Sequence, residues 1–113
     1  MWQVRFKWLQ TAISLRHSDS VDVKFILSDG TSESQKTISM QHRHLLDLAK
    51  NAGVTMTDPW CARLAMLHLK YLIESGEDME KDLVSVSPSE LAGYEARIRN
   101  WEAEEVRKRR GAA

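Results

Sequence analysis

The chain has 113 residues, of which 42% are hydrophobic and 28% are charged, and its sixteen basic and sixteen acidic residues cancel. These values are ordinary for one folded domain, and they exclude wholesale disorder and a second core. A protein that binds nucleic acid mainly through phosphates carries a basic excess, so the balanced charge argues against that class. We expect a single domain over residues 1–113, strand-rich over 1–38 and helical over 39–110.

The cysteine count and the lack of long apolar runs predict the cellular compartment of the protein. Cys61 is the only cysteine, so an internal disulfide is impossible and a reducing compartment is the default. Charge interrupts the apolar residues of the first segment, and no run approaches the roughly 20 residues of a membrane span. The sequence predicts a soluble intracellular protein of the cytoplasm or nucleus, without membrane contact.

The first element predicted is a half-buried strand over residues 2–8. Its apolar residues occupy every second position, the period of a strand with one buried face: Trp2, Val4, Phe6 and Trp8. Leu9 and Ile13 also continue a helical spacing from Phe6. Residues 8–16 therefore fit either more strand or a short helix.

A β-hairpin is predicted next. The same alternation returns at Val21, Val23, Phe25 and Leu27, and the Asp29-Gly30 dipeptide that follows suits a tight hairpin turn. The return strand, about residues 32–38, is polar over most of its length. Polarity of this kind discourages pairing with other chains and is typical of a sheet edge.

Two helices are predicted after the hairpin. The first runs from a Ser39 cap to about Ala52 and ends at Gly53. The second starts at Asp58-Pro59, read as a cap followed by proline at the first helical position, and ends at Gly76. Its polar side chains form one narrow stripe, so this helix is expected to be the central one, covered on most sides: Arg63, Lys70 and Glu74.

The last helix has the most complete start signal in the chain. Ser87 and Glu90 form a capping box around Pro88, with Val86 and Leu91 at the positions of a hydrophobic staple. We expect a connecting loop over 76–85 and a helix over 88–110. Its apolar seam is expected to dock on the domain's own core through Trp101: Leu91, Tyr94, Ile98 and Trp101.

Together these elements predict an α+β fold. A small antiparallel sheet of two or three N-terminal strands packs against three helices, of which the last is long and amphipathic.

Candidate catalytic or metal-binding residues are few. His42 and His44 point about 160° apart on a helix, and Cys61 and His68 lie two turns apart, roughly 10 Å. These spacings match neither a zinc site nor a thiolate–imidazole pair. Cys61 and His68 lie opposite the polar stripe, so we expect both to be buried and Cys61 to be unreactive. We expect no catalytic residues, cofactor, metal or small-molecule substrate.

Three fragments resemble the BTB/POZ superfamily, most closely its elongin-C branch. Residues 22–30 (DVKFILSDG) are similar to the first hairpin of that family, and 42–46 (HRHLL) to the start of its next helix. Residues 70–76 (KYLIESG) are similar to a stretch that closes a later helix. The spacing between His42 and Val54 is about half of what the family uses there. The resemblance implies an adaptor fold that assembles complexes and catalyses nothing.

A second resemblance supports an alternative function. Residues 46–55 (LDLAKNAGVT) resemble the start of a bacterial helix-turn-helix, which implies a DNA-binding regulator using helices at about 40–52 and 58–75. The second helix offers few polar side chains that could read bases, which disfavours this alternative.

The favoured function is a small protein–protein interaction module, an adaptor or a subunit of a larger assembly. The partner is expected to be another protein or a second copy of the chain. The expected contact residues lie on the first strand and on the end of the last helix: Trp2, Trp8, Glu104, Glu105, Val106, Arg107, Arg109 and Arg110.

Overall fold

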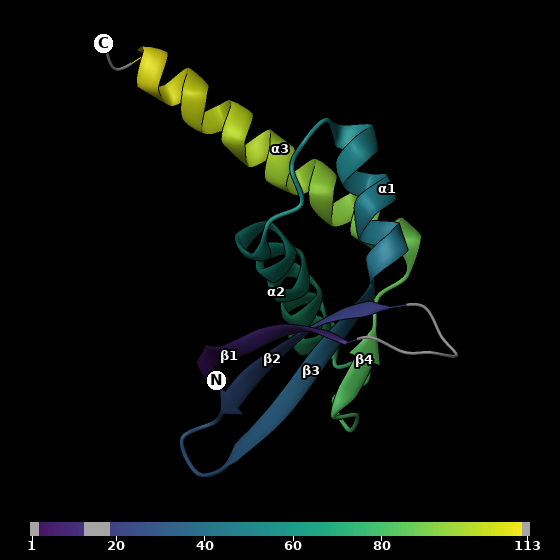
Figure 1. The fold of residues 1–113 in the computed structure, drawn as a ribbon. Helices are drawn as coiled ribbons and strands as arrows, with labels where there is room; N and C mark the ends of the chain where they lie inside the picture. The colour runs from purple at the N-terminus through teal and green to yellow at the C-terminus, as the bar shows by residue number, and fades with distance from the viewer. Residues whose placement is uncertain (1–2, 13–18, 112–113) are drawn as a thin grey trace.

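The computed structural model describes residues 3–12 and 19–111 and has the predicted α+β architecture (Figure 1). The elements, in chain order, are β1 (Gln3–Ala12), β2 (Ser20–Ser28), β3 (Glu33–Gln41), α1 (His42–Ala52), α2 (Asp58–Ser75), β4 (Leu83–Ser85) and α3 (Pro88–Gly111). The four strands form one sheet in the order β1-β2-β3-β4. Within the described ranges, no helix combines the length and the apolar character that crossing a membrane requires.

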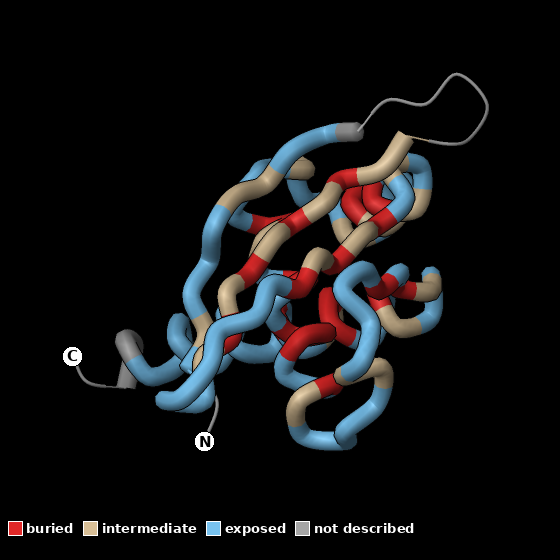
Figure 2. The backbone as a smooth tube through the Cα atoms, turned by 90° about the horizontal axis from the view of Figure 1, so that it is seen from below, coloured by how far each residue is buried: buried red, intermediate tan, exposed pale blue. Residues whose placement is uncertain are grey.

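The core lies between one face of the sheet and the helices (Figure 2). Strand β2 supplies this face with every second side chain, as its alternation predicts, and all four are buried: Val21, Val23, Phe25 and Leu27. The hairpin to β3 turns at Gly30, whose φ of 93° is readily adopted only by glycine. The Asp29 carboxylate accepts hydrogen bonds from the Thr31 and Ser32 amides, which lowers its pKa to about 2.

Strand β1 is longer than predicted and contains a bulge. It pairs antiparallel with β2 as far as Ala12, so the helix alternative is wrong for residues 8–12, while 13–16 lie outside the described residues. Phe6 pairs with Phe25 and Trp8 with Lys24, which leaves Lys7 as the extra residue. The bulge moves Trp8 to the opposite face of the sheet from Phe6. The expectation that Phe6 and Trp8 share one face is therefore wrong.

The segment predicted to be a loop over 76–85 contains the fourth strand. β4 pairs in parallel with β3, with Val84 opposite Ile38, so the predicted sheet of two or three antiparallel strands is corrected to a mixed sheet of four. This pairing also means that β3 is not an edge strand at residues 37–39. Parallel neighbours need a long crossover connection, and the segment containing α1 and α2 provides it.

Helix α1 begins two residues later than predicted. Ser39 belongs to β3 and pairs with Asp22 and Ser85, so it cannot cap a helix. The residue at the N-cap is Gln41, which makes no side-chain cap bond. The helix ends at Gly53 as predicted, with a φ of 71° and a bond of 3.0 Å from the Val54 amide to the Ala49 carbonyl.

Helix α2 is the central helix, as predicted. Thr57 caps it by accepting a hydrogen bond from the Trp60 amide, so Asp58 is the first helical residue and not the cap. The predicted polar stripe is exposed, and the remaining faces are largely buried: Trp60, Cys61, Leu64, Ala65, Leu67, His68, Leu69 and Leu72. The helix packs on β2 and β3 on one side and on α3 on another.

The start of α3 forms as its sequence predicts. The Glu90 amide donates to the Ser87 hydroxyl at 3.2 Å, and the Ser87 amide donates to the Glu90 carboxylate at 3.1 Å. Val86 and Leu91 are both buried, as the staple requires. Farther along, Tyr94 and Ile98 are buried as predicted, but Trp101 is 44% exposed, so the expected docking through Trp101 is wrong. The C-terminal end of α3 projects beyond the body of the domain (Figure 1).

A buried lysine fastens the connection between α2 and β4 to the sheet. Lys36 lies on the core face of β3 with 2% of its surface exposed, and its Nζ donates to the carbonyl oxygens of Asp78 and Lys81 at 2.5 and 2.7 Å. Burial lowers the pKa of Lys36, while the nearby carboxylates of Asp78, Glu80 and Asp82 oppose that shift. The lysine therefore supplies donors that the loop backbone needs in order to lie against the sheet.

Replacing Lys36 by methionine tests this fastening. Lys36→Met keeps an apolar stem but removes both donors, so we expect the free energy of unfolding to fall by about 1–3 kcal/mol, measured by urea denaturation. The neighbouring Gln35 is exposed, and Gln35→Met should change stability by less than about 0.5 kcal/mol. Equal stability of Lys36→Met and the parent chain would contradict the role given to Lys36.

Candidate functional site

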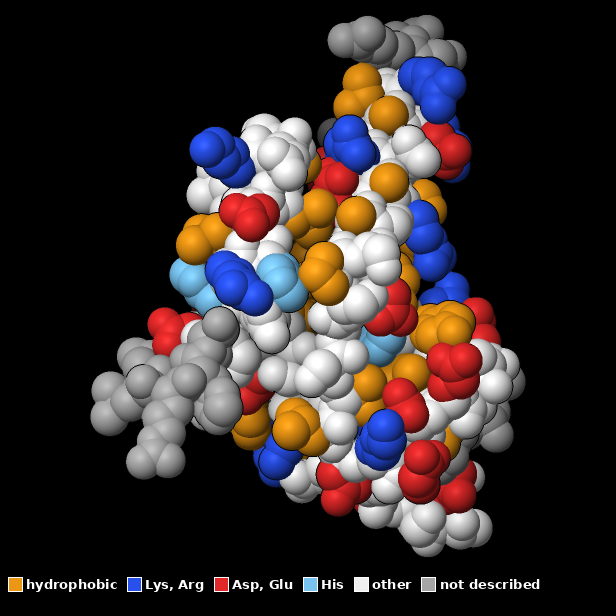
Figure 3. Space-filling view, turned by 90° about the vertical axis from the view of Figure 1, so that its right-hand side faces the viewer, with side chains coloured by type: hydrophobic (Ala, Val, Ile, Leu, Met, Phe, Trp, Pro, Cys, Tyr) orange, Lys and Arg blue, Asp and Glu red, His pale blue; other side chains and the backbone are white. Residues whose placement is uncertain are grey.

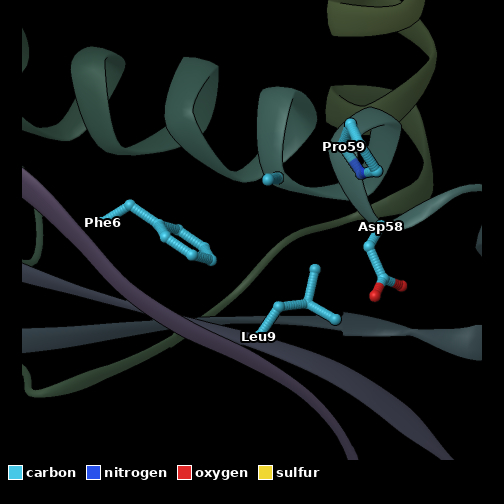
Figure 4. Close-up of a pocket in the computed structure, with 5 residues that line it drawn as sticks. Phe6, Leu9, Asp58 and Pro59 are labelled. Carbon is cyan, nitrogen blue, oxygen red and sulfur yellow. The ribbon is translucent and has the colours of Figure 1, made fainter.

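A hollow on the surface of the described residues lies between β1 and the start of α2 (Figure 4). It has a volume of about 410 Å³ and mostly apolar walls: Phe6 and Leu9 from β1, and Asp58, Pro59 and Ala62 from α2. Phe6 and Leu9 reach it from the core-facing side of the sheet, and the Asp58 carboxylate lies at its edge. We call this feature the β1–α2 hollow.

The β1–α2 hollow exists because the helices do not cover the whole sheet. They pack mainly on β2 and β3, and the core-facing side chains of β1 are covered only in part. Phe6 packs edge-on against Phe25, with ring centroids 6.2 Å apart, yet 53% of Phe6 stays exposed. Its cross-strand neighbour Phe25 is 1% exposed. An aromatic side chain on the core face is therefore half covered.

The first-strand contact residues predicted from sequence are not the ones that line this hollow. Trp8 lies on the outer face of the sheet, where the Lys24 ammonium group sits 5.1 Å from its ring. Trp2 lies outside the described residues. Leu9 takes the place on the core face that the alternation gave to Trp8, because the bulge at Lys7 shifts the pattern by one residue, while Phe6 keeps its predicted face.

A second candidate surface is the projecting end of α3. The predicted contact residues Glu104, Glu105, Val106 and Arg107 are all exposed there, and Val106 is 46% exposed. The side chains of Arg109 and Arg110 lie outside the described ones. Trp101 stacks with its own neighbour, the Arg97 guanidinium, at 5.4 Å from the ring.

A hollow of about 290 Å³ lies where the projecting end meets α2. It is lined by Arg63, Trp101, Glu102, Glu105 and Val106. The Arg63 guanidinium and the Glu102 carboxylate are 3.3 Å apart, and both side chains are more than half exposed. An exposed pair of this kind contributes about 0–1 kcal/mol.

A smaller hollow of about 180 Å³ lies between α1 and α3. Hydrophobic side chains gather along this junction in Figure 3. His44, Leu48, Pro88 and Ala92 are among the residues that line it, and the buried His44 Nδ1 has no hydrogen-bond partner among the described atoms. Its smaller volume makes it a weaker candidate than the β1–α2 hollow.

The titratable groups inside the core form a structural contact between α2 and α3. His68 Nδ1 lies 2.7 Å from the Tyr94 hydroxyl oxygen and 3.7 Å from a Glu90 carboxylate oxygen. Burial raises the pKa of Tyr94 to about 12, so its hydroxyl stays protonated and can donate to His68. Burial lowers the pKa of His68, and the Glu90 carboxylate opposes this shift. None of the hollows described above includes His68.

The remaining candidates from the sequence are the side chains considered as metal ligands and the Cys61 thiol. Among the described residues, no group of three or more histidine, cysteine, aspartate or glutamate side chains could hold a metal ion. Cys61 is buried as predicted, and burial together with the Asp58 charge raises the pKa of its thiol to about 11. A buried thiol with this pKa is a poor nucleophile.

Comparison with models of known families, with curated proteins and with solved structures finds no match to this chain. The BTB/POZ and helix-turn-helix resemblances therefore stay predictions from short fragments. The evidence on function comes from the surfaces of the chain itself.

Cys61 labelling tests the burial of the α2 face. In the folded protein we expect Cys61 to react with a maleimide only through opening of the domain, and so far more slowly than a free thiol. A matched control is Ser32→Cys in the exposed hairpin turn, which should label one thiol per chain rapidly and leave Cys61 unmodified. Rapid labelling of both thiols would show that the α2 face is open.

The neutral state of His68 predicts a dependence of stability on pH. Because its pKa in the folded protein lies below the ordinary 6.5, the unfolded chain takes up the proton first as the pH falls. The stability contribution is fully present above pH 6.5 and is lost as the pH falls toward the folded pKa. We expect His68→Gln to reduce the loss of stability between about pH 7.5 and pH 5.

Chemical denaturation at both pH values measures this effect, and His42→Gln is the control because it removes an imidazole from a partly exposed position. The control should keep the parent dependence on pH. The same pH dependence in His68→Gln and in the parent chain would contradict a neutral, buried His68.

Proposed function

We propose that this chain is a small protein–protein interaction module, an adaptor or a subunit of a larger assembly, without catalysis of its own. The observation that carries the proposal is Phe6, an aromatic side chain on the core face of the sheet that is 53% exposed beside an apolar hollow. Large apolar side chains that line a hollow are typical of binding surfaces and are costly to leave in water. The unpaired thiol of Cys61 favours the cytoplasm or nucleus.

The chemistry of the β1–α2 hollow indicates what would occupy it. Phe6, Leu9 and Pro59 favour an apolar side chain, and the Asp58 carboxylate at the edge favours a cation or hydrogen-bond donor beside it. We therefore propose a partner segment that places an apolar side chain in the hollow and an Arg or Lys next to Asp58. Desolvated apolar anchors at the centre of an interface usually contribute most of its affinity.

Pairing along the free edge of β1 is a poorer explanation of binding. β1 has a bulge at Lys7 and carries the charges of Arg5 and Lys7. Bulges and charged side chains on an edge strand discourage the pairing of a further strand. The face of β1 and not its edge is thus the proposed contact. This differs from the Trp2 and Trp8 contact expected from the sequence.

The DNA-binding alternative has less support. It requires α2 to place side chains in a major groove, yet α2 packs on the sheet and on α3. Its exposed basic side chains, Arg63 and Lys70, each lie within 4.0 Å of a glutamate carboxylate. A gel-shift assay on duplex DNA at low salt is the direct check, and we expect no shift.

Substitutions on both walls of the β1–α2 hollow test the proposed function. We expect affinity capture with the folded chain to recover a partner protein. Two variants should lose this binding equally: Phe6→Ser on the β1 wall and Ala62→Glu on the α2 wall. Loss of the anchor at an interface centre typically weakens binding by at least about 2 kcal/mol, or roughly thirtyfold. Binding would be measured by calorimetry with the purified partner.

The control is Lys7→Ser, which changes an exposed residue of the same strand outside the hollow and should bind as the parent chain does. Circular dichroism and thermal unfolding would show that the variants are folded. Capture that survives substitution of both walls, or the absence of any hollow-dependent partner, would contradict the proposal.

A further inference from the structure

The projecting end of α3 has a charge pattern that is divided at Val106. Three glutamates precede it, Glu102, Glu104 and Glu105, and four consecutive basic residues follow it at 107–110. The described side chains of this stretch are exposed, and the helix here has left the body of the domain (Figures 1 and 3). Favourable alignment with the helix dipole accounts for basic residues at its end, and i, i+4 spacing lets Glu104 pair with Lys108 within the helix. Neither requires the division into one acidic and one basic block.

This pattern is complementary to itself in one orientation only. If two copies of the helix lie antiparallel about a twofold axis near Val106, the glutamates of each face the basic run of the other. A parallel pair would place glutamates beside glutamates and basic residues beside basic residues, which is repulsive. From this complementarity we infer that the ends of α3 from two copies of this chain pair antiparallel and form a weak homodimer.

The hollow between α2 and the end of α3 fits this arrangement. Its walls include the carboxylates of Glu102 and Glu105 and the apolar surfaces of Trp101 and Val106. Because Arg63 already pairs with Glu102, a basic side chain of the second copy would pair there with Glu105, with apolar surface for its aliphatic stem. Trp101 already holds one guanidinium near its ring, that of Arg97.

The size of the contact limits its strength. The stretch from Trp101 to the end of the helix at Gly111 spans about 16 Å at the ordinary rise of an α-helix. Two such stretches bury less area than a standard stable interface. The dimer is therefore weak and depends on ionic strength, since exposed charge pairs are screened by salt.

Charge exchange tests the complementarity. Analytical ultracentrifugation of the whole chain should show concentration-dependent dimers at about 50 mM salt and a dimer affinity lower by about tenfold at 500 mM. Glu102→Lys with Glu105→Lys should abolish association, as should Arg107→Glu with Lys108→Glu, while an equimolar mixture of these two variants should associate again. The control, Glu74→Lys with Glu80→Lys, makes the same net change on exposed positions elsewhere and should dimerise normally.

Cross-linking tests the orientation. In an antiparallel pair, Asn100 of one copy lies near Gly111 of the other, so a mixture of Asn100→Cys and Gly111→Cys should be joined by a short bismaleimide. Gly111→Cys alone should not be joined, and Cys61 is buried in all of these chains.

Three results would overturn the inference: a monomer at all concentrations and salt conditions, a charge mixture that fails to associate, or cross-linking of Gly111→Cys to itself. Phe6→Ser should dimerise like the parent chain, because this contact does not use the β1–α2 hollow. Failure of one proposal is thereby distinguished from failure of the other.

Discussion

The packing of one helix, α2, against a sheet wider than itself determines most of this structure. A helix with its side chains is about 10–12 Å across, and neighbouring strands are about 4.8 Å apart, so one helix covers about two strands. α2 covers β2 and β3, where the buried side chains of both strands meet its own. The strands on either side need other cover, and they obtain it to very different degrees.

On the β4 side, the chain supplies that cover itself. Val84 and Val86 are buried, the Val86 amide donates to the Ser39 carbonyl, and α3 starts directly afterwards with a fully formed capping box. Lys36 completes this side by binding the loop that leads into β4. On the β1 side the cover is partial: Val4 and Leu9 pack against the core, but Phe6 is half exposed and a hollow forms against the start of α2.

Features that depend on neighbouring residues could be predicted from the sequence. The capping box at Ser87 and Glu90 and the helix end at Gly53 are each decided within a few residues, and both form as expected. The hairpin turns at Asp29-Gly30 as predicted, but its loop is wider than a tight two-residue turn, because Ser28 pairs with Glu33 and Gly30 has a positive φ whereas Asp29 does not. The buried face of α2 follows from its periodicity alone. Prediction from neighbouring residues was wrong for the start of α1. Ser39 satisfies the capping pattern, but it pairs within the sheet, so the helix begins later.

Features that depend on tertiary contacts could not be predicted in this way. β4 has three residues, of which only Val84 is buried, so it shows no alternation to detect. The exposure of Trp101 depends on where the body of the domain ends beneath α3, and the seam itself does not indicate this. The β1–α2 hollow joins β1 to α2 residues about fifty positions away, and the bulge at Lys7 decides which β1 side chains reach it.

The central observation is that the core-facing side of β1 is open to solvent at Phe6, whereas that of β2 is covered at Phe25. The chain has only two phenylalanines, Phe6 on β1 and Phe25 on β2, so ring-labelled phenylalanine gives two sets of NMR signals that report on each strand. A soluble paramagnetic agent should strongly broaden the Phe6 signals and leave the Phe25 signals nearly unchanged, in dilute protein with no partner added. Equal protection of both rings would show that β1 is covered and would contradict the account.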